Sequence, residues 1–247
     1  MNPTDGYDPG APGMGPAQER QALPSGGPTT VLLFSNGHGE DAVGACIARR
    51  LREVAPHIRA WAAPIVGEGL AYRRAGVPVV VPTRGRDPSL WSRDLQAALD
   101  AAQPDLVVLA GFLARVPPPV VAAYAGRMLN LHPALLPAFG GPGLYGRRVH
   151  EAVLRAGVRV TGATVHWVTD ELDAGPIVAQ WPVPVLPGDT PDTLAARVQQ
   201  VEHRLLPATV EALLRGGAPP APPPFHFAPA AAPPSVEELP RWMPPAR

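Results

Sequence analysis

The sequence has no lysine, a single cysteine and no long hydrophobic run, and each absence narrows the class of protein. Its 21 basic residues are all arginine and are matched by 21 acidic residues, so no basic footprint for a nucleic acid is present. The lone Cys46 excludes an internal disulfide and a zinc site built from several cysteines. No apolar stretch reaches the length of about 18 residues that a membrane span needs. We therefore expect a cytoplasmic protein that binds neither nucleic acid nor membrane and holds no metal.

Proline, in contrast, is abundant, with 35 residues in a chain of 247. Residues 1–28 are rich in glycine, proline and polar residues, and residues 217–247 are rich in proline and alanine. Both segments have too few core-forming residues, so we predict two disordered tails. The remaining residues, 29–216, are expected to form one domain.

Between the tails, short apolar runs alternate with segments of helical periodicity. Strands are predicted at residues 29–35, 58–64, 77–81, 105–110, 127–131, 162–169 and 177–185. Helices are predicted at residues 40–54, 90–102, 120–125, 149–156 and 190–215. Pro182 and Pro184 place the last strand at a sheet edge, and Pro207 predicts a kink or break in the last helix. The alternation indicates an α/β fold with a mostly parallel, doubly wound sheet that binds ligands at the carboxyl ends of its strands.

Polar residues at the end of one predicted strand form the first candidate site. In the segment NLHPALLP, Asn130 and His132 are two residues apart, and in an extended chain such side chains point the same way. An amide donor beside an imidazole can stabilise an oxyanion and transfer a proton. The alternative is a polar strand end that contacts only solvent.

A second segment, HWVTDELDAGP, begins at His166 and carries three carboxylates within four residues. A carboxylate beside an imidazole orients its ring and favours its charged form, and Asp173 is our candidate for that partner of His132. The alternative is an ordinary acidic turn. His166 itself is interpreted either as a packed core imidazole or as a residue that supports the site. His203 is expected at the surface.

Together, these two segments resemble the folate-dependent formyltransferases, and most of all those that act on glycinamide ribonucleotide in purine synthesis. The matching patterns are N-x-H-P-x-L-L-P and H-x-V-x-D-E-L-D-x-G-P. Residues 105–112, 141–154 and 185–206 are similar to further stretches of that family. The resemblance extends from about residue 104 to residue 214, and it implies a Rossmann-like formyltransferase fold.

The resemblance also implies the reaction and its residues. The cosubstrate would be 10-formyltetrahydrofolate, and the acceptor would be a small-molecule amine. Asn130 and His132 would stabilise the oxyanion formed when the amine attacks the formyl carbon, while Asp173 keeps His132 protonated. Glu202 matches a residue that contacts the acceptor ribose. The folate would contact Leu113, Ala114, Arg115, Val116, Asn130, Thr169 and Asp170, although the family has arginine where Ala114 stands.

The N-terminal loop departs from the family pattern. His38, Gly39 and Glu40 occupy the positions of a glycine-rich loop that binds the acceptor phosphate. Glycine at a helix start suits an anion, but the carboxylates of Glu40 and Asp41 repel a phosphate and stabilise the helix start instead. A tight strand–helix turn with acidic capping is therefore an equal alternative. The segment SNGHGEDAVGACIARRL also resembles the start of lipid-A-disaccharide-synthase-related glycosyltransferases.

Several functions consequently stay open on the sequence alone. They are formyl transfer to glycinamide ribonucleotide, formyl transfer to another amine such as a sugar-nucleotide amine, and folate or nucleotide binding without catalysis. The presence of Asn130, His132 and Asp173 together favours the two enzymes. A glycosyltransferase fragment rests only on the N-terminal segment and lacks the second domain that such enzymes need. The sequence does not predict an oligomeric state.

Overall fold

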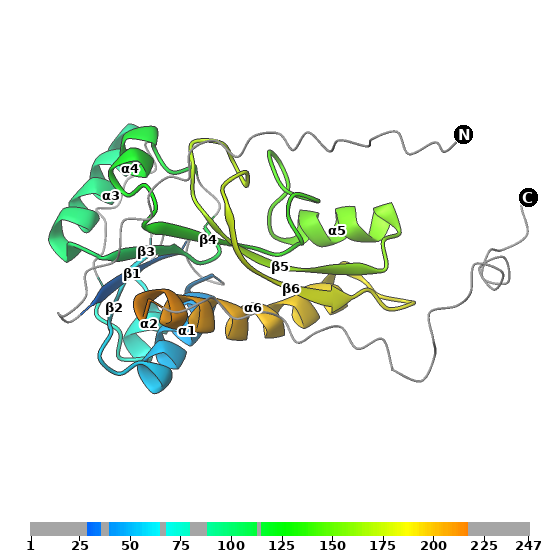
Figure 1. The fold of residues 1–247 in the computed structure, drawn as a ribbon, viewed down its shortest axis with the longest axis horizontal. Coiled ribbons are helices and arrows are strands. Elements are labelled where there is room, and N and C mark those ends of the chain that lie inside the picture. Colours follow the sequence, from blue (N-terminus) through cyan, green and yellow to red (C-terminus); the bar gives the residue numbers. More distant parts are fainter. Residues whose placement is uncertain (1–28, 36–39, 65–67, 80–87, 113–114, 217–247) are drawn as a thin grey trace, which may run out of the picture.

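A computed structural model describes residues 29–35, 40–64, 68–79, 88–112 and 115–216 of the chain (Figure 1). Both predicted tails lie outside these ranges. Four predicted site residues, His38, Gly39, Leu113 and Ala114, also lie outside them.

The described residues form one six-stranded sheet with the order β2-β1-β3-β4-β5-β6. The strands are β1 (Thr30–Ser35), β2 (Arg59–Pro64), β3 (Leu106–Leu109), β4 (Met128–His132), β5 (Val160–Trp167) and β6 (Ile177–Pro184). The pairs β1–β2, β1–β3 and β3–β4 are parallel, whereas β4–β5 and β5–β6 are antiparallel. The predicted α/β class with a mostly parallel sheet is confirmed, as is the edge position of β6. The antiparallel direction of β5 and β6 was not predicted.

Six helices accompany the sheet within the described ranges. They are α1 (Glu40–Val54), α2 (Leu70–Arg74), α3 (Pro88–Ala102), α4 (Pro118–Ala123), α5 (Arg147–Ala156) and α6 (Pro191–Leu214). The sequence did not predict α2, because its five residues are too short to show a helical period. The strand predicted at 77–81 is represented only by an isolated parallel bridge between Ala62 and Val79, and residues 80–81 lie outside the described ranges.

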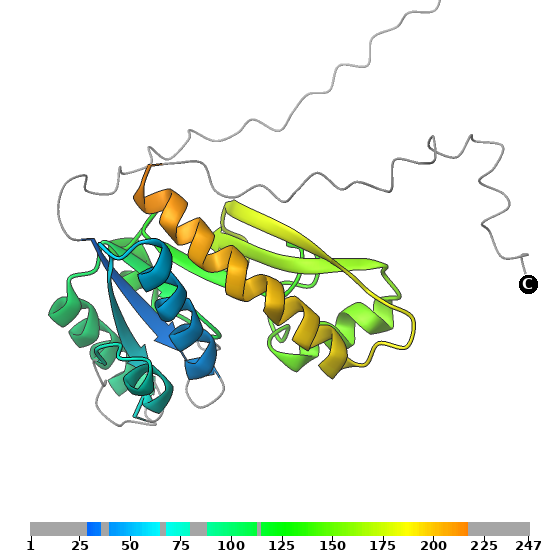
Figure 2. The same cartoon turned by 90° about the horizontal axis from the view of Figure 1, so that it is seen from below.

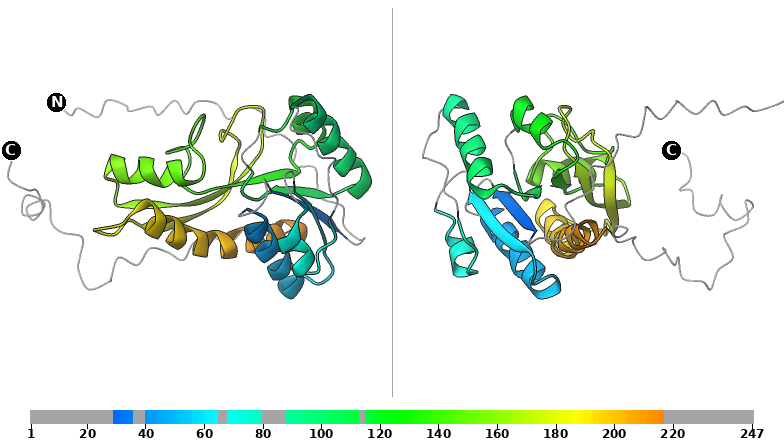
Figure 3. Two further views of the ribbon diagram at one scale, coloured as in Figure 1. Left: turned by 180° about the vertical axis from the view of Figure 1, so that it is seen from behind. Right: turned by 60° about the vertical axis from the view of Figure 1, so that its left-hand side comes forward.

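Alternate side chains of the strands are buried in two hydrophobic cores, one on each face of the sheet. Leu32 and Phe34 of β1 belong to the cluster that includes α3 and α4, and Val31 and Leu33 belong to the cluster that includes α1 and α6. Figures 1, 2 and 3 show α3 and α4 on one face, with α1 and α6 on the other. The apolar runs of β1 and β3 are therefore explained by burial on both faces.

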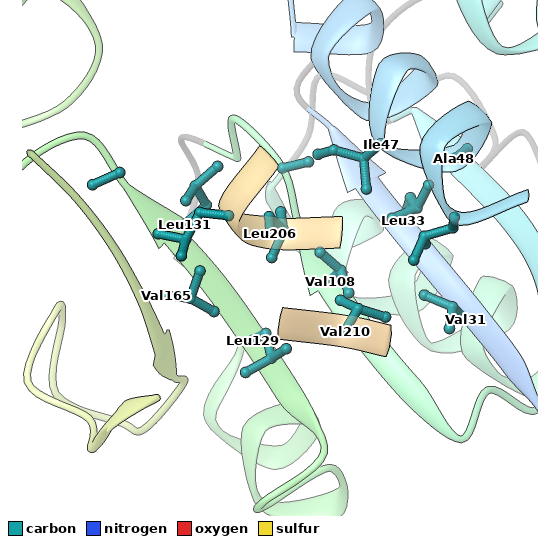
Figure 4. Close-up of a cluster of buried hydrophobic side chains, with 14 of the residues drawn as sticks. Val31, Leu33, Ile47, Ala48, Val108, Leu129, Leu131, Val165, Leu206 and Val210 are labelled. Carbon is teal, nitrogen blue, oxygen red and sulfur yellow. The ribbon is translucent and has the colours of Figure 1, made fainter. Parts of the chain in front are cut away.

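The last helix, α6, packs along one face of the sheet, where it contacts α1 as well as β5 and β6 (Figure 2). Its N-cap Thr190 accepts a hydrogen bond from the backbone N–H of Thr193, which confirms the predicted cap followed by proline. The predicted break at Pro207 is wrong, because α6 continues as one helix to Leu214. Figure 4 shows Leu206 and Val210, which flank Pro207 in this helix, among side chains of the central strands.

Candidate active site

The register of β4 and β5 brings the polar strand residues side by side. Asn130 and His132 point to the same side of β4, as predicted from their spacing. On the antiparallel neighbour β5, His166 lies opposite Asn130, and Thr164 lies opposite His132. The Asn130 amide nitrogen is 3.1 Å from His166 Nε2. The carboxyl end of a parallel strand, β4, therefore supplies two candidate residues, and an antiparallel strand supplies a third.

Asp173 joins the two imidazoles of this group. One carboxylate oxygen lies 3.7 Å from His132 Nδ1, and the other lies 3.7 Å from His166 Nε2. The Asp173 carboxylate also accepts the backbone N–H of Gly141 at 2.9 Å, which fixes its orientation. Its backbone has φ of 55°, in the left-handed region. The structure thus places Asp173 beside His132, as the sequence predicted.

The two ring nitrogens of His132 both face acceptors. Nε2 lies 2.8 Å from the carbonyl oxygen of Phe139, and Nδ1 faces the Asp173 carboxylate. A neutral imidazole has only one N–H, so only the protonated ring donates toward both oxygens. His132 is buried, with an exposed fraction of 4%, so these two oxygens dominate its surroundings. The geometry therefore directs one ring nitrogen of His132 to a backbone carbonyl and the other to a carboxylate.

His166 differs from His132, because it accepts a hydrogen bond through one of its ring nitrogens. Its Nδ1 lies 3.0 Å from the carbonyl oxygen of Trp167, and Nδ1–H is the donor in that contact. Burial lowers the pKa of His166, with nearby His132 acting in the same direction, while the Trp167 carbonyl and Asp173 oppose the shift. A neutral ring with its proton on Nδ1 leaves Nε2 free to accept a hydrogen bond from the Asn130 amide. His166 thus orients the Asn130 side chain.

The chain that follows His132 is fixed to β5 by one buried hydroxyl. Thr164 donates to the carbonyl of Ala134 at 2.6 Å and accepts the backbone N–H of Leu136 at 3.0 Å. Gln180 on β6 donates to the carbonyl of Leu136 at 2.8 Å. Buried backbone groups that find such partners avoid a desolvation cost of about 1–3 kcal/mol each. These bonds hold the loop that leads to Phe139 in place.

Asn130, His132, His166 and Asp173 border a cavity of about 480 Å³ at the carboxyl ends of β3 and β4. The predicted residues Arg115, Val116, Asn130, His132, Thr169, Asp170, Asp173 and Glu202 line it. Arg115 donates to the backbone carbonyl of Asp170 at 2.8 Å, so the two predicted folate-binding segments are joined directly. The cavity wall there also contains the apolar side chains of Leu109 and Val168. Its volume is within the usual range for small-molecule sites.

The structure describes only two of the four predicted acceptor-binding residues, Glu202 and Glu40. Glu202, on α6, lines the cavity, and burial raises the pKa of its carboxyl to about 7. Glu40 is the first residue of α1. Because His38 and Gly39 lie outside the described residues, the predicted phosphate-binding loop stays a prediction.

Two buried histidines of the site were not among the predicted site residues. His166 alternates with apolar strand residues and therefore looked equally like a core residue. His150, on α5, lines the same cavity, and its Nδ1 is buried without a hydrogen-bond partner in the described part of the chain. Burial lowers the pKa of His150, and nearby His132 lowers it further. The cross-strand register places His166 at the cavity, and the position of α5 places His150 there. Neither position can be inferred from a single sequence.

Across the described ranges, no group of three histidine, cysteine or acidic residues is arranged to hold a metal ion. No helix within these ranges combines the length and the apolar character that a membrane crossing requires.

Comparison with known proteins agrees with this geometry. The formyl transferase family model matches residues 63–210. The chain is 41% identical to phosphoribosylglycinamide formyltransferase of Mycobacterium tuberculosis over 208 residues, which is 81% of this chain and 92% of the relative. It is 48% identical to the chloroplastic enzyme of that name from Arabidopsis thaliana over 149 residues, which is 59% of this chain, and it spans only 51% of that longer relative.

A solved structure has the same architecture. Glycinamide ribonucleotide transformylase 1 from Symbiobacterium toebii superimposes with a TM-score of 0.66 at 33% identity, covering 76% of this chain and 88% of that one. The family model and the mycobacterial relative both include the segment from Asn130 to Asp173 that builds the cavity wall. The chain therefore belongs to the formyl transferase family.

Proposed function

We propose that this protein transfers a formyl group from 10-formyltetrahydrofolate to the amine of glycinamide ribonucleotide, a step of purine synthesis. The observation that carries the proposal is the grouping of Asn130, His132 and Asp173 on one cavity wall. The names of the mycobacterial, plant and solved relatives support this acceptor.

The first role of the site is to stabilise negative charge. Attack of the acceptor amine on the formyl carbon moves electrons onto the formyl oxygen, which then needs hydrogen-bond donors. We assign this work to the Asn130 amide and to the His132 imidazolium, whose Nε2–H would turn from the Phe139 carbonyl to the oxyanion. Because one Asn130 N–H is directed to His166, the second N–H has a fixed direction and is available to the oxyanion. Such preorganised donors lose little free energy through reorganisation during the reaction.

The second role is proton transfer. The attacking amine becomes positively charged and must lose a proton, while the departing folate nitrogen must gain one. His132 is the proposed acid, and the nearby Asp173 carboxylate balances its charge. At 3.7 Å, the Asp173–His132 distance is longer than a hydrogen bond, so a small movement or one bridging water completes the contact. The same carboxylate accepts the amine proton through water.

The residues that bind the two substrates follow from the walls of the cavity. We assign Leu113, Ala114, Arg115, Val116, Thr169 and Asp170 to the folate, because the described members of this set surround a partly apolar pocket suited to a flat ring. Glu202, His38, Gly39 and Glu40 are assigned to the acceptor. Glu202 accepts a hydrogen bond from a ribose hydroxyl when its carboxyl is ionised. The proposed reaction is placed in the cytoplasm, which fractionation of cells tests.

A formyl-transfer assay decides between the acceptors. Purified full-length protein is incubated with 10-formyltetrahydrofolate and glycinamide ribonucleotide, and in parallel with a sugar-nucleotide amine or with no amine. We expect rapid release of tetrahydrofolate only with glycinamide ribonucleotide. Turnover with the sugar amine alone would reject the proposed acceptor, and formate release without any amine would indicate hydrolysis. Absence of turnover in all three reactions, with folate still bound, would indicate a binding protein.

A further inference from the structure

A second cavity, of about 500 Å³, opens between α1 and α6. It is lined by Cys46, Arg49, Arg50, Glu53, His203, Arg204, Ala208 and Glu211, and we call it the α1–α6 groove. Figure 2 shows the two helices side by side on one face of the sheet. No residue of the groove belongs to the active-site cavity. Adjacent residues of α6 face the two spaces, since Glu202 lines the active site and His203 lines the groove.

The charges of the groove are unbalanced. Its two carboxylates are already paired, Glu53 with Arg50 at 2.9 Å and Glu211 with Arg215 at 2.9 Å. Arg49 and Arg204 have no ion pair or hydrogen bond with any of the residues that the structure describes. They are exposed residues on facing helices, so two free guanidinium groups border one concave space. Like charges arranged in this way repel each other until a counter-charge enters between them.

A partly buried imidazole adds a third polar group to this space. His203 Nε2 is inaccessible to solvent and has no hydrogen-bond partner in the described part of the chain. Burial lowers the pKa of His203, and the charge of Arg49 lowers it further. A buried polar atom left without a partner costs about 1–3 kcal/mol, so a ligand that satisfies it gains that free energy.

We propose that the α1–α6 groove is a binding site for a small phosphate-bearing ligand. The planar guanidinium groups of Arg49 and Arg204 bind phosphate oxygens, and a small rotation of the His203 ring brings its Nε2–H to the same group. The volume of the groove accommodates a diphosphate or a phosphate ester rather than a bare ion alone. The site lies on the opposite side of α6 from the active-site cavity, and it does not depend on the identity of the acceptor.

The probe for this site is inorganic pyrophosphate, titrated into the full-length protein. Calorimetry measures the affinity, and the NMR signal of the His203 ring proton on Cε1 reports binding at this groove alone. We expect saturable binding together with a shift of the His203 signal. The double variant Arg49→Ala/Arg204→Ala should weaken the binding that shifts this signal by about tenfold or more, because each guanidinium contributes a charge-assisted hydrogen bond.

Matched controls separate the groove from other anion sites. Arg155→Ala removes an exposed arginine on α5 and should leave the His203 titration unchanged. Because Arg49 and Arg204 are exposed, the double variant should melt at the wild-type temperature, which a circular-dichroism melt checks. An unmoved His203 signal at millimolar pyrophosphate would overturn the proposal. Equal binding by the wild type and the double variant at this signal would also overturn it.

Discussion

The two ends of the sheet differ in the polarity of the side chains that their strands bury. At the parallel end, β1 and β3 are buried along their whole length, and all of β3 and most of β1 are apolar. At the antiparallel end, β5 buries Thr161, Thr164 and His166. The strand β4 separates the two ends and contributes Asn130 and His132. The parallel end therefore provides a rigid support, and the chemical groups of the candidate site lie at and beyond β4.

The largest effect is expected from removing the imidazole at the boundary of the two ends. His132→Ala should lower kcat by roughly two to four orders of magnitude, the usual contribution of general acid–base catalysis, with folate affinity mostly intact. Steady-state formyl transfer and folate titration measure the two quantities. The control is His57→Ala, an exposed residue that precedes β2 at the parallel end, which should leave both unchanged. Activity near that of the wild type in His132→Ala would remove this residue from the mechanism.

Asparagine at Asp173 tests the carboxylate without changing the side-chain shape. Asp173→Asn should lower kcat by about a hundredfold, at the lower end of the range for acid–base groups, because the charge facing His132 and His166 is lost. A matched residue exists at the parallel end, since Asp105 accepts the backbone N–H of Thr30 at 2.8 Å much as Asp173 accepts that of Gly141. Asp105→Asn should affect stability without changing kcat. Equal kcat losses in the two variants would show that Asp173 has only a structural role.

Glycines at the two ends should also differ in their tolerance of a methyl group. A Cβ at Gly175 would collide with the backbone carbonyl of Trp167, whereas a Cβ at Gly44 would meet the hydroxyl end of the Tyr72 side chain. Because backbone yields less than a side chain, Gly175→Ala should lower the free energy of unfolding by about 1–3 kcal/mol, and Gly44→Ala should lower it by less. Urea denaturation measures both. A larger loss in Gly44→Ala would reverse this part of the comparison.

The last effect is a pH dependence of stability that acts through Glu202 on α6. Burial raises the pKa of Glu202 in the folded protein to about 7, above its ordinary value of 4.5, so between these values the folded state holds a proton that the unfolded state has lost. The free energy of unfolding should therefore fall as the pH rises from about 4.5 to about 7, by up to about 3 kcal/mol from this group. Glu202→Gln should make the melting temperature less dependent on pH over that window. An unchanged pH dependence in this variant would show that the pKa of Glu202 is not raised.

The sequence predicted the parallel end of the fold well, because buried parallel strands appear as short apolar runs. It also predicted that Asn130, His132 and Asp173 lie together, from strand alternation and from a resemblance. It did not predict the strand direction of β5 and β6, because period-two alternation is the same in both directions. His166, expected either in the core or in support of the site, and the partly buried His203 owe their environments to residues distant in the sequence. A single sequence contains no record of such contacts.

The continuity of α6 has a consequence for how the chain folds. Its residues Leu206 and Val210 complete the same core that contains Val31 and Leu33 of the first strand. During synthesis, the first strand leaves the ribosome long before the helix that covers it. The apolar face of the parallel end therefore stays open until α6 has been synthesised, so contacts of high sequence separation limit the rate of folding. A chain stalled before residue 205 would expose that face and be prone to aggregation.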